Sequence, residues 1–248
     1  MLNLHYSGKR ALVLGGSCDM GLALAEAMSA CGIYPLLTYR DTKGQARIDA
    51  RLRPLGRDYD TLHLELKAPQ AFGRLQDVLD QGITYLVDMA HADLEGLVAA
   101  VDASAAGDYF SSQIAARTAV IQLVARAMLS RRRGRMVYVS STAAARPHPG
   151  QGFYAAAKQA AEALYRSLGL ELAGRGITTV TLRPGYVDAG RGRRYLKDNS
   201  SQALSRVPLG RALTPAEVAH AVMYLLCDEA VGFNATVLTM DSGLSAGK

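Results

Sequence analysis

The sequence predicts an α/β fold: a single Rossmann-like, doubly wound domain with a mostly parallel seven-stranded sheet. Short apolar runs alternate with longer helical patterns from one end of the chain to the other, which is typical of consecutive βαβ units whose sheet is covered on both faces. The 248 residues, 49% of them hydrophobic, are enough for one sizeable core. No repeat, low-complexity run or Pro/Gly/Ser linker divides the chain, so we expect one domain over residues 1–248.

Seven short runs of mostly apolar residues are predicted to form the strands. In chain order they are 10–15, 33–39, 61–66, 84–90, 135–140, 176–182 and 235–240. Helical patterns lie between them, beginning with an Ala/Leu/Met-rich stretch over 20–30 and a polar stretch that ends near residue 54. The remaining expected helices are 69–80, 103–130, 153–173 and 214–227.

Composition argues against several classes of protein. The sequence has 28 Lys+Arg against 22 Asp+Glu, a net charge of +6, and most of the basic residues are Arg. Mean hydropathy is +0.04, and no stretch approaches the roughly 18 consecutive apolar residues of a membrane span. Residues 1–10 contain no apolar signal segment, and three cysteines are too few and too scattered for a disulfide framework or a metal cluster. We therefore expect a cytoplasmic protein without a metal site.

The first predicted strand runs directly into a glycine-rich turn, Leu14 to Gly21, and then into a helix. Glycines permit a tight turn and a close approach of the backbone, and the helix N-terminus offers free N–H groups to a pyrophosphate. This context predicts a dinucleotide site, and a tight turn without a ligand is the alternative. The contacts expected in the turn are Gly15, Ser17, Cys18, Met20 and Gly21.

The end of the second predicted strand indicates which dinucleotide is bound. Sites for NAD place an acid there, which bonds the ribose 2′-hydroxyl. This chain has Thr38, Tyr39 and Arg40 instead. The planar fork of an arginine suits a 2′-phosphate, so NADP is favoured over NAD. The alternative is a solvated surface arginine, and the neighbouring Asp41 weakens the prediction.

Tyr154 and Lys158 are four residues apart in a predicted helix and so share one helix face. A free tyrosine has a pKa of about 10, and a lysine cation one turn away favours the phenolate, which predicts a general acid/base. Ser141 lies thirteen residues before Tyr154, at the end of a predicted strand, where its hydroxyl could hold a carbonyl oxygen. Tyr39 and Lys43 have the same spacing but no serine thirteen residues before them.

Together these motifs resemble the short-chain dehydrogenase/reductase family over nearly the whole chain. The closest similarity is to β-ketoacyl-acyl-carrier-protein reductases, in residues 126–141 and 151–158. The family's motifs occur in order, and they are the glycine-rich turn, Ser141, Tyr154 with Lys158, Arg183-Pro184-Gly185, Val207 to Arg211, and Leu238 to Gly243. The resemblance implies a cofactor half at about 1–130 and a catalytic and substrate half at about 131–248.

The resemblance also implies a mechanism, in which NADPH gives a hydride to a ketone carbon. Tyr154 would protonate the oxygen, Ser141 would bind that oxygen, and Lys158 would hold the ribose hydroxyls. Gln113 would take the place of the family's Asn that holds a relay water. The residues implied to contact NADP(H) are Gly15, Ser17, Cys18, Met20, Gly21, Tyr39, Arg40, Glu65, Leu66, Ala90, His91, Lys158, Pro184, Gly185 and Val187.

Several positions depart from the family pattern. Asp19 replaces the middle glycine of the turn, Asp88 and His91 stand in the family's Asn-Asn-Ala-Gly motif, and Ala189 replaces a threonine that bonds the nicotinamide amide. Each change is either drift in a tolerant scaffold or a sign of altered cofactor binding. His91 either packs or contacts a ligand, and Cys18 is either inert or activated by the helix N-terminus.

The positive charge is concentrated in two segments. Residues 131–135 and 191–197 each hold four basic residues and no acid, and the remaining chain has 20 basic and 22 acidic residues. The second segment corresponds to a mobile substrate lid in similar reductases. The substrate carbonyl is therefore expected on an acyl-carrier protein or coenzyme A, with Arg132 and Arg175 implied as docking residues. Solvated surface charge is the alternative, and neither nucleic acid nor membrane is an expected partner.

The leading hypothesis is an NADPH-dependent reductase of a β-ketoacyl thioester or related ketone, in fatty acid or polyketide metabolism. Two alternatives are a non-catalytic NADP(H)-binding or scaffold member of the family, and an alcohol dehydrogenase acting on a sugar or steroid. An enoyl reductase is disfavoured, since those relatives have a wider Tyr–Lys spacing. The resemblance also suggests a homotetramer or homodimer formed through the helices at 103–130 and 153–173 and the C-terminal strand.

Overall fold

The structure, a computed structural model, describes residues 3–66 and 71–246. Its centre is a seven-stranded sheet with the order β3-β2-β1-β4-β5-β6-β7, and every neighbouring pair is parallel. The strands are β1 (Arg10–Leu14), β2 (Tyr34–Tyr39), β3 (Asp60–His63), β4 (Tyr85–Asp88), β5 (Gly134–Val139), β6 (Ile177–Pro184) and β7 (Thr236–Met240). The predicted fold class is confirmed.

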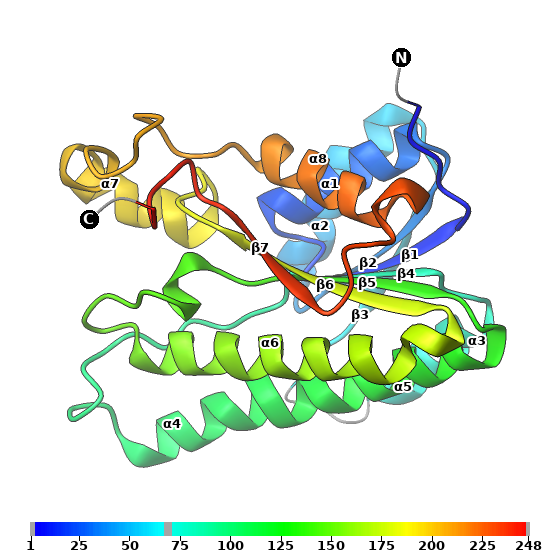
Figure 1. The fold of residues 1–248 in the computed structure, drawn as a ribbon, viewed down its shortest axis with the longest axis horizontal. Helices are drawn as coiled ribbons and strands as arrows, with labels where there is room; N and C mark the ends of the chain where they lie inside the picture. The colour runs from blue at the N-terminus through cyan, green and yellow to red at the C-terminus, as the bar shows by residue number, and fades with distance from the viewer. Residues whose placement is uncertain (1–2, 67–70, 247–248) are drawn as a thin grey trace.

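Helices cover both faces of the sheet, as Figure 1 shows. One face carries α1 (Asp19–Ala30), α2 (Thr42–Leu52) and α8 (Pro215–Leu226). The other carries α3 (Ala71–Asp80), α4 (Ala103–Phe110), α5 (Arg117–Arg131) and α6 (Gly152–Leu172). The helix α7 (Gly190–Leu204) lies beyond the carboxyl ends of the strands. No helix in the described ranges is long and apolar enough to cross a membrane.

The apolar strand residues divide between two cores because successive side chains of a strand point to opposite faces. On β1, Ala11 and Val13 belong to the core under α1 and α8, whereas Leu12 and Leu14 belong to the core under α5 and α6. The parallel register places Leu12 opposite hydrophobic partners on both neighbouring strands. Both faces are thus sealed, which explains why the strands are runs of apolar residues rather than alternating ones.

Two segments differ from the sequence prediction. The helix expected over 103–130 is interrupted by a π-helical turn, Ser111–Ala116, which separates α4 from α5. The segment 190–204, expected only as a lid, is a helix with a kink at Asn199. The start of the helix expected at residue 69 falls outside the described residues, and strand boundaries move by one to three residues.

Candidate active site

A cleft of about 890 Å³ opens at the carboxyl edge of the sheet. Strand β1 lies between β2 and β4, so the strand order reverses at this edge, and such switch points bind ligands in open α/β sheets. The cleft brings the predicted cofactor turn and the predicted catalytic residues together. The predicted site residues that line it are Cys18, Met20, His91, Ser141, Tyr154, Lys158, Pro184, Gly185 and Val187.

Tyr154 and Lys158 occupy the first turns of α6, and both side chains are buried. The Lys158 Nζ lies 5.8 Å from the centre of the Tyr154 ring and donates a hydrogen bond of 2.9 Å to the carbonyl of Val139. Burial, and then the nearby positive charge of Arg117, lower the pKa of Lys158 to about 7. Near neutral pH the ammonium group is therefore poised to lose its proton.

Two serines, Ser140 and Ser141, directly follow β5, and they have different surroundings. Ser141 begins the turn Thr142–Ala144, where its Oγ accepts a 3.2 Å hydrogen bond from the Ala143 N–H, and it lines the cleft. Ser140 instead donates a 2.5 Å hydrogen bond to the buried carboxylate of Glu162. Glu162 also pairs with Arg183 at 2.5 Å. Both serines line the cleft, but the Ser140 O–H is engaged with Glu162, whereas the Ser141 Oγ acts as an acceptor toward Ala143.

The glycine-rich turn has the close backbone packing that a dinucleotide site needs. Gly15 has φ +76°, and a Cβ at Gly16 would lie 2.7 Å from the side chain of Leu37. A Cβ at Gly21 would lie 2.7 Å from the Gly16 carbonyl oxygen. Ser17 completes the turn, its Oγ 3.1 Å from where a Cβ at Gly44 of α2 would be. Helix α1 begins directly after the turn, so its free N–H groups and positive dipole end face this edge of the sheet.

Cys18 is the N-cap of α1, and its Sγ accepts a 3.3 Å hydrogen bond from the Gly21 N–H. Burial raises the pKa of the thiol above its ordinary value. The structure therefore supports the inert alternative rather than a thiol activated by the helix N-terminus.

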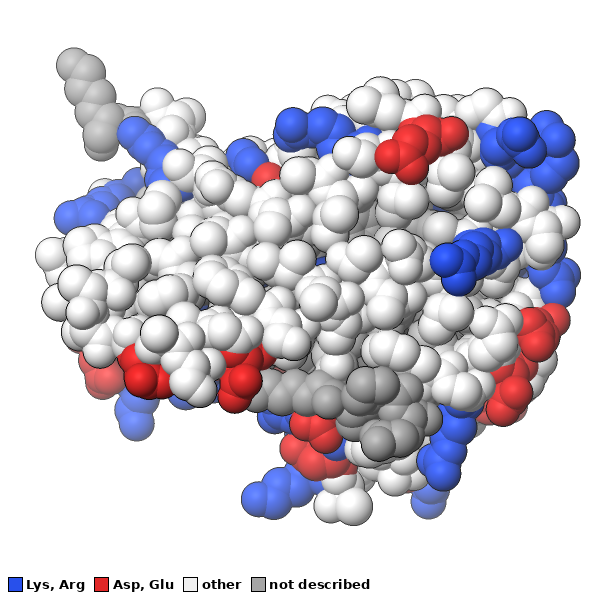
Figure 2. Space-filling model, turned by 90° about the horizontal axis from the view of Figure 1, so that it is seen from below, with Lys and Arg blue, Asp and Glu red and all other residues white. Residues whose placement is uncertain are grey.

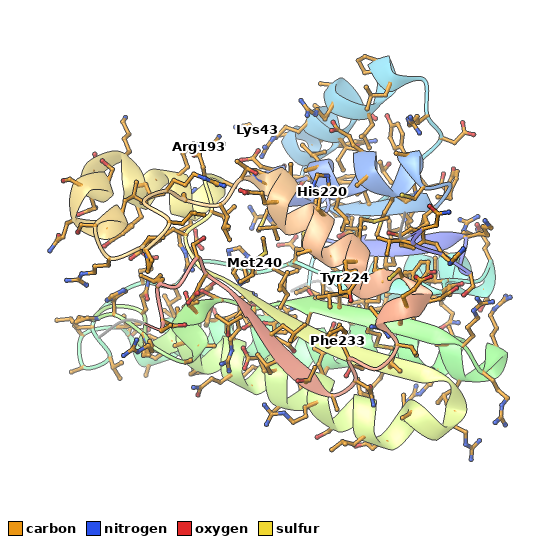
Figure 3. All side chains as sticks on the ribbon, turned by 45° about the horizontal axis from the view of Figure 1, so that its top comes forward. Lys43, Arg193, His220, Tyr224, Phe233 and Met240 are labelled. Carbon is orange, nitrogen blue, oxygen red and sulfur yellow. The ribbon has the colours of Figure 1, made fainter. Side chains whose placement is uncertain are left out.

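The carboxylate of Asp19 is neutralised by two arginines from other elements. Arg47 of α2 pairs with it at 2.5 Å and Arg193 of α7 at 3.6 Å. Figure 3 shows Arg193 and Lys43, one turn before Arg47 on α2, on the same side of the molecule. Asp19 thus links the turn to α2 and α7, which explains how this position tolerates an acid.

The predicted adenosine side of the site lies at the ends of β2 and β3. The Arg40 side chain is largely exposed and 4.0 Å from Asp41. Asp41 caps α2, because its Oδ1 accepts a 2.8 Å hydrogen bond from the Gly44 N–H. Tyr39 packs against the ring of His63 at 5.5 Å, and Glu65 and Leu66 follow β3.

The segment after β4 faces both the turn and the cleft. Ala90 packs against the turn, since a Cβ at Gly15 would lie 3.0 Å from its backbone nitrogen. The His91 ring meets the Tyr154 ring edge-on at 5.9 Å. Desolvation by the surrounding protein, and then the positive charge of Lys158, lower the pKa of His91 below its ordinary value. His91 is thus a neutral imidazole at neutral pH, placed beside the expected proton donor.

Gln113 lies in the π-helical turn and is buried. Its Oε1 accepts a 3.2 Å hydrogen bond from the Ala92 N–H, and its Nε2 donates one of 3.2 Å to Ser112. Its implied role with a relay water stays a prediction.

The sequence did not identify two residues that contact the site. The Arg191 guanidinium of α7 lies 3.5 Å above the centre of the Tyr154 ring. Asp93, after β4, pairs with Arg194 at 2.9 Å and with Arg191 at 3.9 Å. The sequence pointed to this region in two ways, through the basic residues of segment 191–197 and through its correspondence to a lid in similar reductases. Ala189 is the N-cap of α7 and has no side-chain hydrogen bond to offer.

The basic cluster predicted at 131–135 does not form one surface patch. Arg135 is buried on β5, where it donates to the carbonyls of Leu225 and Ala230. The exposed Arg132 comes close to the turn containing Arg175, because β5 and β6 pair there. This turn is at the amino ends of the strands, opposite the cleft, so these two residues do not border the entrance of their own chain.

Comparison with known proteins agrees with this arrangement. The family model described as "Enoyl-(Acyl carrier protein) reductase" matches residues 17–245. The chain is 28% identical over 247 residues to the 3-oxoacyl-[acyl-carrier-protein] reductase FabG of Escherichia coli, covering 97% of this chain and 99% of that protein. It is 28% identical over 250 residues to a ketoacyl reductase of the granaticin polyketide synthase of Streptomyces violaceoruber, covering 94% and 92%.

Solved structures give the same result. A variant of actinorhodin polyketide ketoreductase solved with NADPH superposes with a TM-score of 0.88 at 26% identity, covering 98% of this chain and 99% of that one. A protein described only by the name of its dehydrogenase/reductase family superposes with a TM-score of 0.85 at 25% identity, covering 96% and 98%.

Proposed function

The chain belongs to the short-chain dehydrogenase/reductase family, and on this premise we propose that it is an NADPH-dependent ketoreductase with Tyr154 as proton donor. Its oxidoreductase class follows from the family. One observation carries the finer proposal: Ser141, Tyr154 and Lys158 line one cleft together with Cys18 and Met20 of the dinucleotide turn. The proposed substrate is a β-ketoacyl thioester or related ketone, which is supported by the names of the fatty-acid and polyketide relatives.

The residues of the turn fit a nicotinamide dinucleotide, because its glycines let the turn pack closely on itself and on β2, where a Cβ at Gly16 or Gly21 would clash. This close packing leaves backbone N–H groups at the start of α1 for a pyrophosphate. Bound NADPH would supply the hydride. The backbone of Pro184, Gly185 and Val187 would form the nicotinamide side of the cleft. The exposed Arg40 would bind the 2′-phosphate. The Asp41 carboxylate accepts the hydrogen bond that caps α2 and so is not directed at a ribose hydroxyl, which supports NADP over NAD.

The chemistry of the carbonyl oxygen would be carried by three side chains. Ser141 holds the oxygen by a hydrogen bond, and Tyr154 donates the proton as negative charge develops on it. The Lys158 ammonium group stabilises the phenolate that remains and binds the ribose hydroxyls. The neutral His91 closes the cleft at the edge of the tyrosine ring without competing for the proton.

The spacing of Tyr154 and Lys158 favours ketone reduction over enoyl reduction, although the matching family model carries an enoyl reductase description. Three residues separate the pair, so both side chains lie on one face of α6 and meet at the cleft. This geometry suits protonation of a carbonyl oxygen.

The test is Tyr154→Phe, assayed by NADPH oxidation with a panel of β-ketoacyl thioesters. We expect kcat to fall at least about 100-fold, the usual contribution of a positioned general acid. The matched control is Tyr224→Phe, because Tyr224 is a partly exposed tyrosine of α8 that lies outside the cleft. It should keep the wild-type kcat. Full activity in Tyr154→Phe would disprove the assignment.

One observation favours a second candidate, a member of the family that binds NADP(H) without turnover. Arg191 covers the face of the Tyr154 ring, so a substrate must enter past it. NADPH binding by fluorescence titration, with no turnover of ketones or of alcohols in the reverse direction, would support this candidate instead. Turnover of sugar or steroid alcohols alone would support the oxidative dehydrogenase.

The oligomer is proposed to form through the face of α4, α5 and α6, where Figure 2 shows few charged side chains across the centre. Leu170 of α6 is 70% exposed in a single chain, which fits a partner subunit at this face. The molar mass measured by light scattering on the protein as it elutes from a size-exclusion column distinguishes a tetramer, a dimer and a monomer. Among the described residues, four arginines line the cleft, Arg191 and Arg194 on α7 and Arg146 and Arg206 outside that helix, whereas Arg132 and Arg175 do not. We therefore propose that an anionic carrier is attracted to the cleft arginines rather than to Arg132 and Arg175.

A further inference from the structure

Strand β4 ends in a buried ion pair that the proposed mechanism does not use. Asp88, its last residue, is 0% exposed, and its partner Arg117, the first residue of α5, is 2% exposed. Asp88 also accepts a 3.0 Å hydrogen bond from the Tyr165 hydroxyl and one of 3.1 Å from the Ala90 N–H. Removing two charges from water is costly, and a packed apolar pair would stabilise the fold as well or better. This pair therefore calls for a role besides stability.

Arg117 uses its guanidinium to hold three separate parts of the site. It binds the Asp88 carboxylate, the carbonyl of Ala90, and Gln113, whose backbone oxygen accepts a 3.0 Å hydrogen bond from Arg117 Nε. Gln113 in turn holds the Ala92 N–H. Arg117 thus fixes the segment 88–92 at both ends and joins it to the π-helical turn.

That segment contacts both halves of the site. Its Ala90 backbone packs against Gly15 of the cofactor turn, and its His91 ring packs against Tyr154. Arg117 also lies 5.5 Å from the centre of the Tyr138 ring, and the Lys158 Nζ lies 4.9 Å from the same ring. The two cations therefore share one aromatic neighbour.

We propose that Asp88 and Arg117 form a positioning pair for the active site: Arg117 fixes the segment 88–92 between the cofactor turn and Tyr154, and the two opposite charges together set the electrostatic environment of the Lys158 ammonium group. The inference deepens the proposed function, because it concerns the same lysine and tyrosine. Neither residue reaches the cleft, so each acts through other groups.

The charged surroundings of Lys158 make the proposal testable. Arg117 from α5 and Arg191 from α7 lower the pKa of the lysine, in addition to the effect of burial, whereas Asp88 from β4 and Glu162 from α6 raise it. His91, which is neutral at neutral pH, also lies near this lysine, as do the rings of Tyr138 and Tyr154. Neutralising Arg117 should therefore shift the pKa of Lys158 in one direction, and neutralising Asp88 should shift it in the opposite direction.

The experiment follows the 13Cε signals of labelled lysine across a pH series in the full-length protein without substrate. The chain has six lysines, and Lys158→Arg assigns the signal of interest. We expect Arg117→Gln to raise the pKa of Lys158 above its wild-type value of about 7, and Asp88→Asn to lower it. The double variant Asp88→Asn/Arg117→Gln should return the pKa toward wild type and unfold at a higher temperature than Asp88→Asn, whose arginine is buried without its partner.

The matched control is Arg135→Gln, which removes another buried arginine that binds backbone carbonyls, but at the amino end of β5, at the opposite edge of the sheet from the cleft. It should lower the melting temperature and leave the Lys158 titration unchanged. Arg117→Lys keeps a charge without the planar fork, and it replaces Arg117→Gln if that variant does not fold. In this variant the pKa of Lys158 should stay near its wild-type value. The kcat should nevertheless fall about tenfold or more, because the segment 88–92 is no longer fixed.

Unchanged titrations in all pair variants, or shifts in the same direction for Arg117→Gln and Asp88→Asn, would overturn the proposal and leave a purely structural pair. The NMR result does not depend on turnover. Opposite shifts in a protein that reduces no ketone would therefore uphold the pair while the proposed function fails.

Discussion

Replacing Asp93 by Asn should release α7, the expected substrate lid, from the cleft. Asp93 follows β4 in the body of the protein, whereas its partners are on α7: Arg194 at 2.9 Å and Arg191 at 3.9 Å. Arg191 is also 3.6 Å from Glu95. Asn has nearly the same shape as Asp, so the substitution removes charge and little packing.

The magnitude follows from the exposure of these groups. Arg194 and Asp93 are 67% and 43% exposed, so their pair contributes about 0.5 kcal/mol. Arg191 is only 19% exposed, which reduces screening, but its distance to Asp93 is too long for a hydrogen bond. Together the contacts amount to about 1 kcal/mol, which corresponds to a roughly fivefold larger open population of the lid.

The chain contains no tryptophan, so a single introduced indole is a reporter without background. Tyr195→Trp places it on α7, where the native ring stacks on Tyr186 of the body at 5.7 Å. Opening breaks this stack and raises the rate of acrylamide quenching. We expect faster quenching when Asp93→Asn is added to Tyr195→Trp. Salt should reproduce the effect in the Tyr195→Trp protein and add little in the double variant.

Asp188→Asn is the matched control. Its 2.8 Å pair with Arg193 joins two residues five positions apart, so the removed charge does not hold α7 to Asp93. Quenching of Trp fluorescence should stay at the rate of the Tyr195→Trp protein that carries no other substitution. If Asp93→Asn quenches no faster than this control, the ion pairs do not hold the lid and the reasoning is refuted.

Three further predictions concern stability and cofactor binding. Thr214→Ala removes the capping box that begins α8, and urea unfolding should show a loss of about 1 kcal/mol, with Thr214→Ser close to wild type. Hydrogen bonds from Arg211, and then from Thr214, lower the pKa of Glu217 to about 2. This carboxylate therefore stabilises the fold above its unfolded pKa of about 4.3, and the contribution is lost as pH falls toward 2, so Glu217→Gln should flatten the fall in unfolding free energy measured over that range. Gly16→Ala should abolish NADPH binding in a fluorescence titration because its Cβ has no room, whereas Gly107→Ala, in open space on α4, should stabilise the protein by about 0.5–1 kcal/mol and bind normally.

The strands and the placement of Tyr154 beside Lys158 at the cleft were predictable because their signals are local. Most strands contain a short apolar run, although β3 reads Asp-Thr-Leu-His, and Tyr154 and Lys158 are one helical turn apart, so their shared helix face follows from the spacing. The dinucleotide turn is local in the same sense. These elements differ from prediction only at their ends.

Long-range charge pairing was not predictable. Asp88 stands out in the sequence only as a departure from the family motif, and its partner Arg117 is 29 residues away. The predicted strand 135–140 already separates Arg135 from Arg131 to Arg133. Its partners are the carbonyls of Leu225 on α8 and Ala230 in the following turn, some 90 residues away, and the sequence does not indicate them. The helix α7 was also not predicted. It contains two glycines and many polar residues, and Ala203 is its one buried residue, so its sequence lacks the apolar periodicity of an amphipathic helix.

The π-helical turn at Ser111–Ala116 has a consequence for how this site tolerates change in chain length. A π-turn is an α-helix with one extra residue, so deleting one residue there would restore regular hydrogen bonding along the helix. The same deletion would rotate everything before it by roughly 100° about the helix axis. Phe110 would then leave Phe153, which it contacts at 5.9 Å and which directly precedes Tyr154. The number of residues in this helix is therefore coupled to the packing of the residue before Tyr154, although regular helical hydrogen bonding does not require the extra residue.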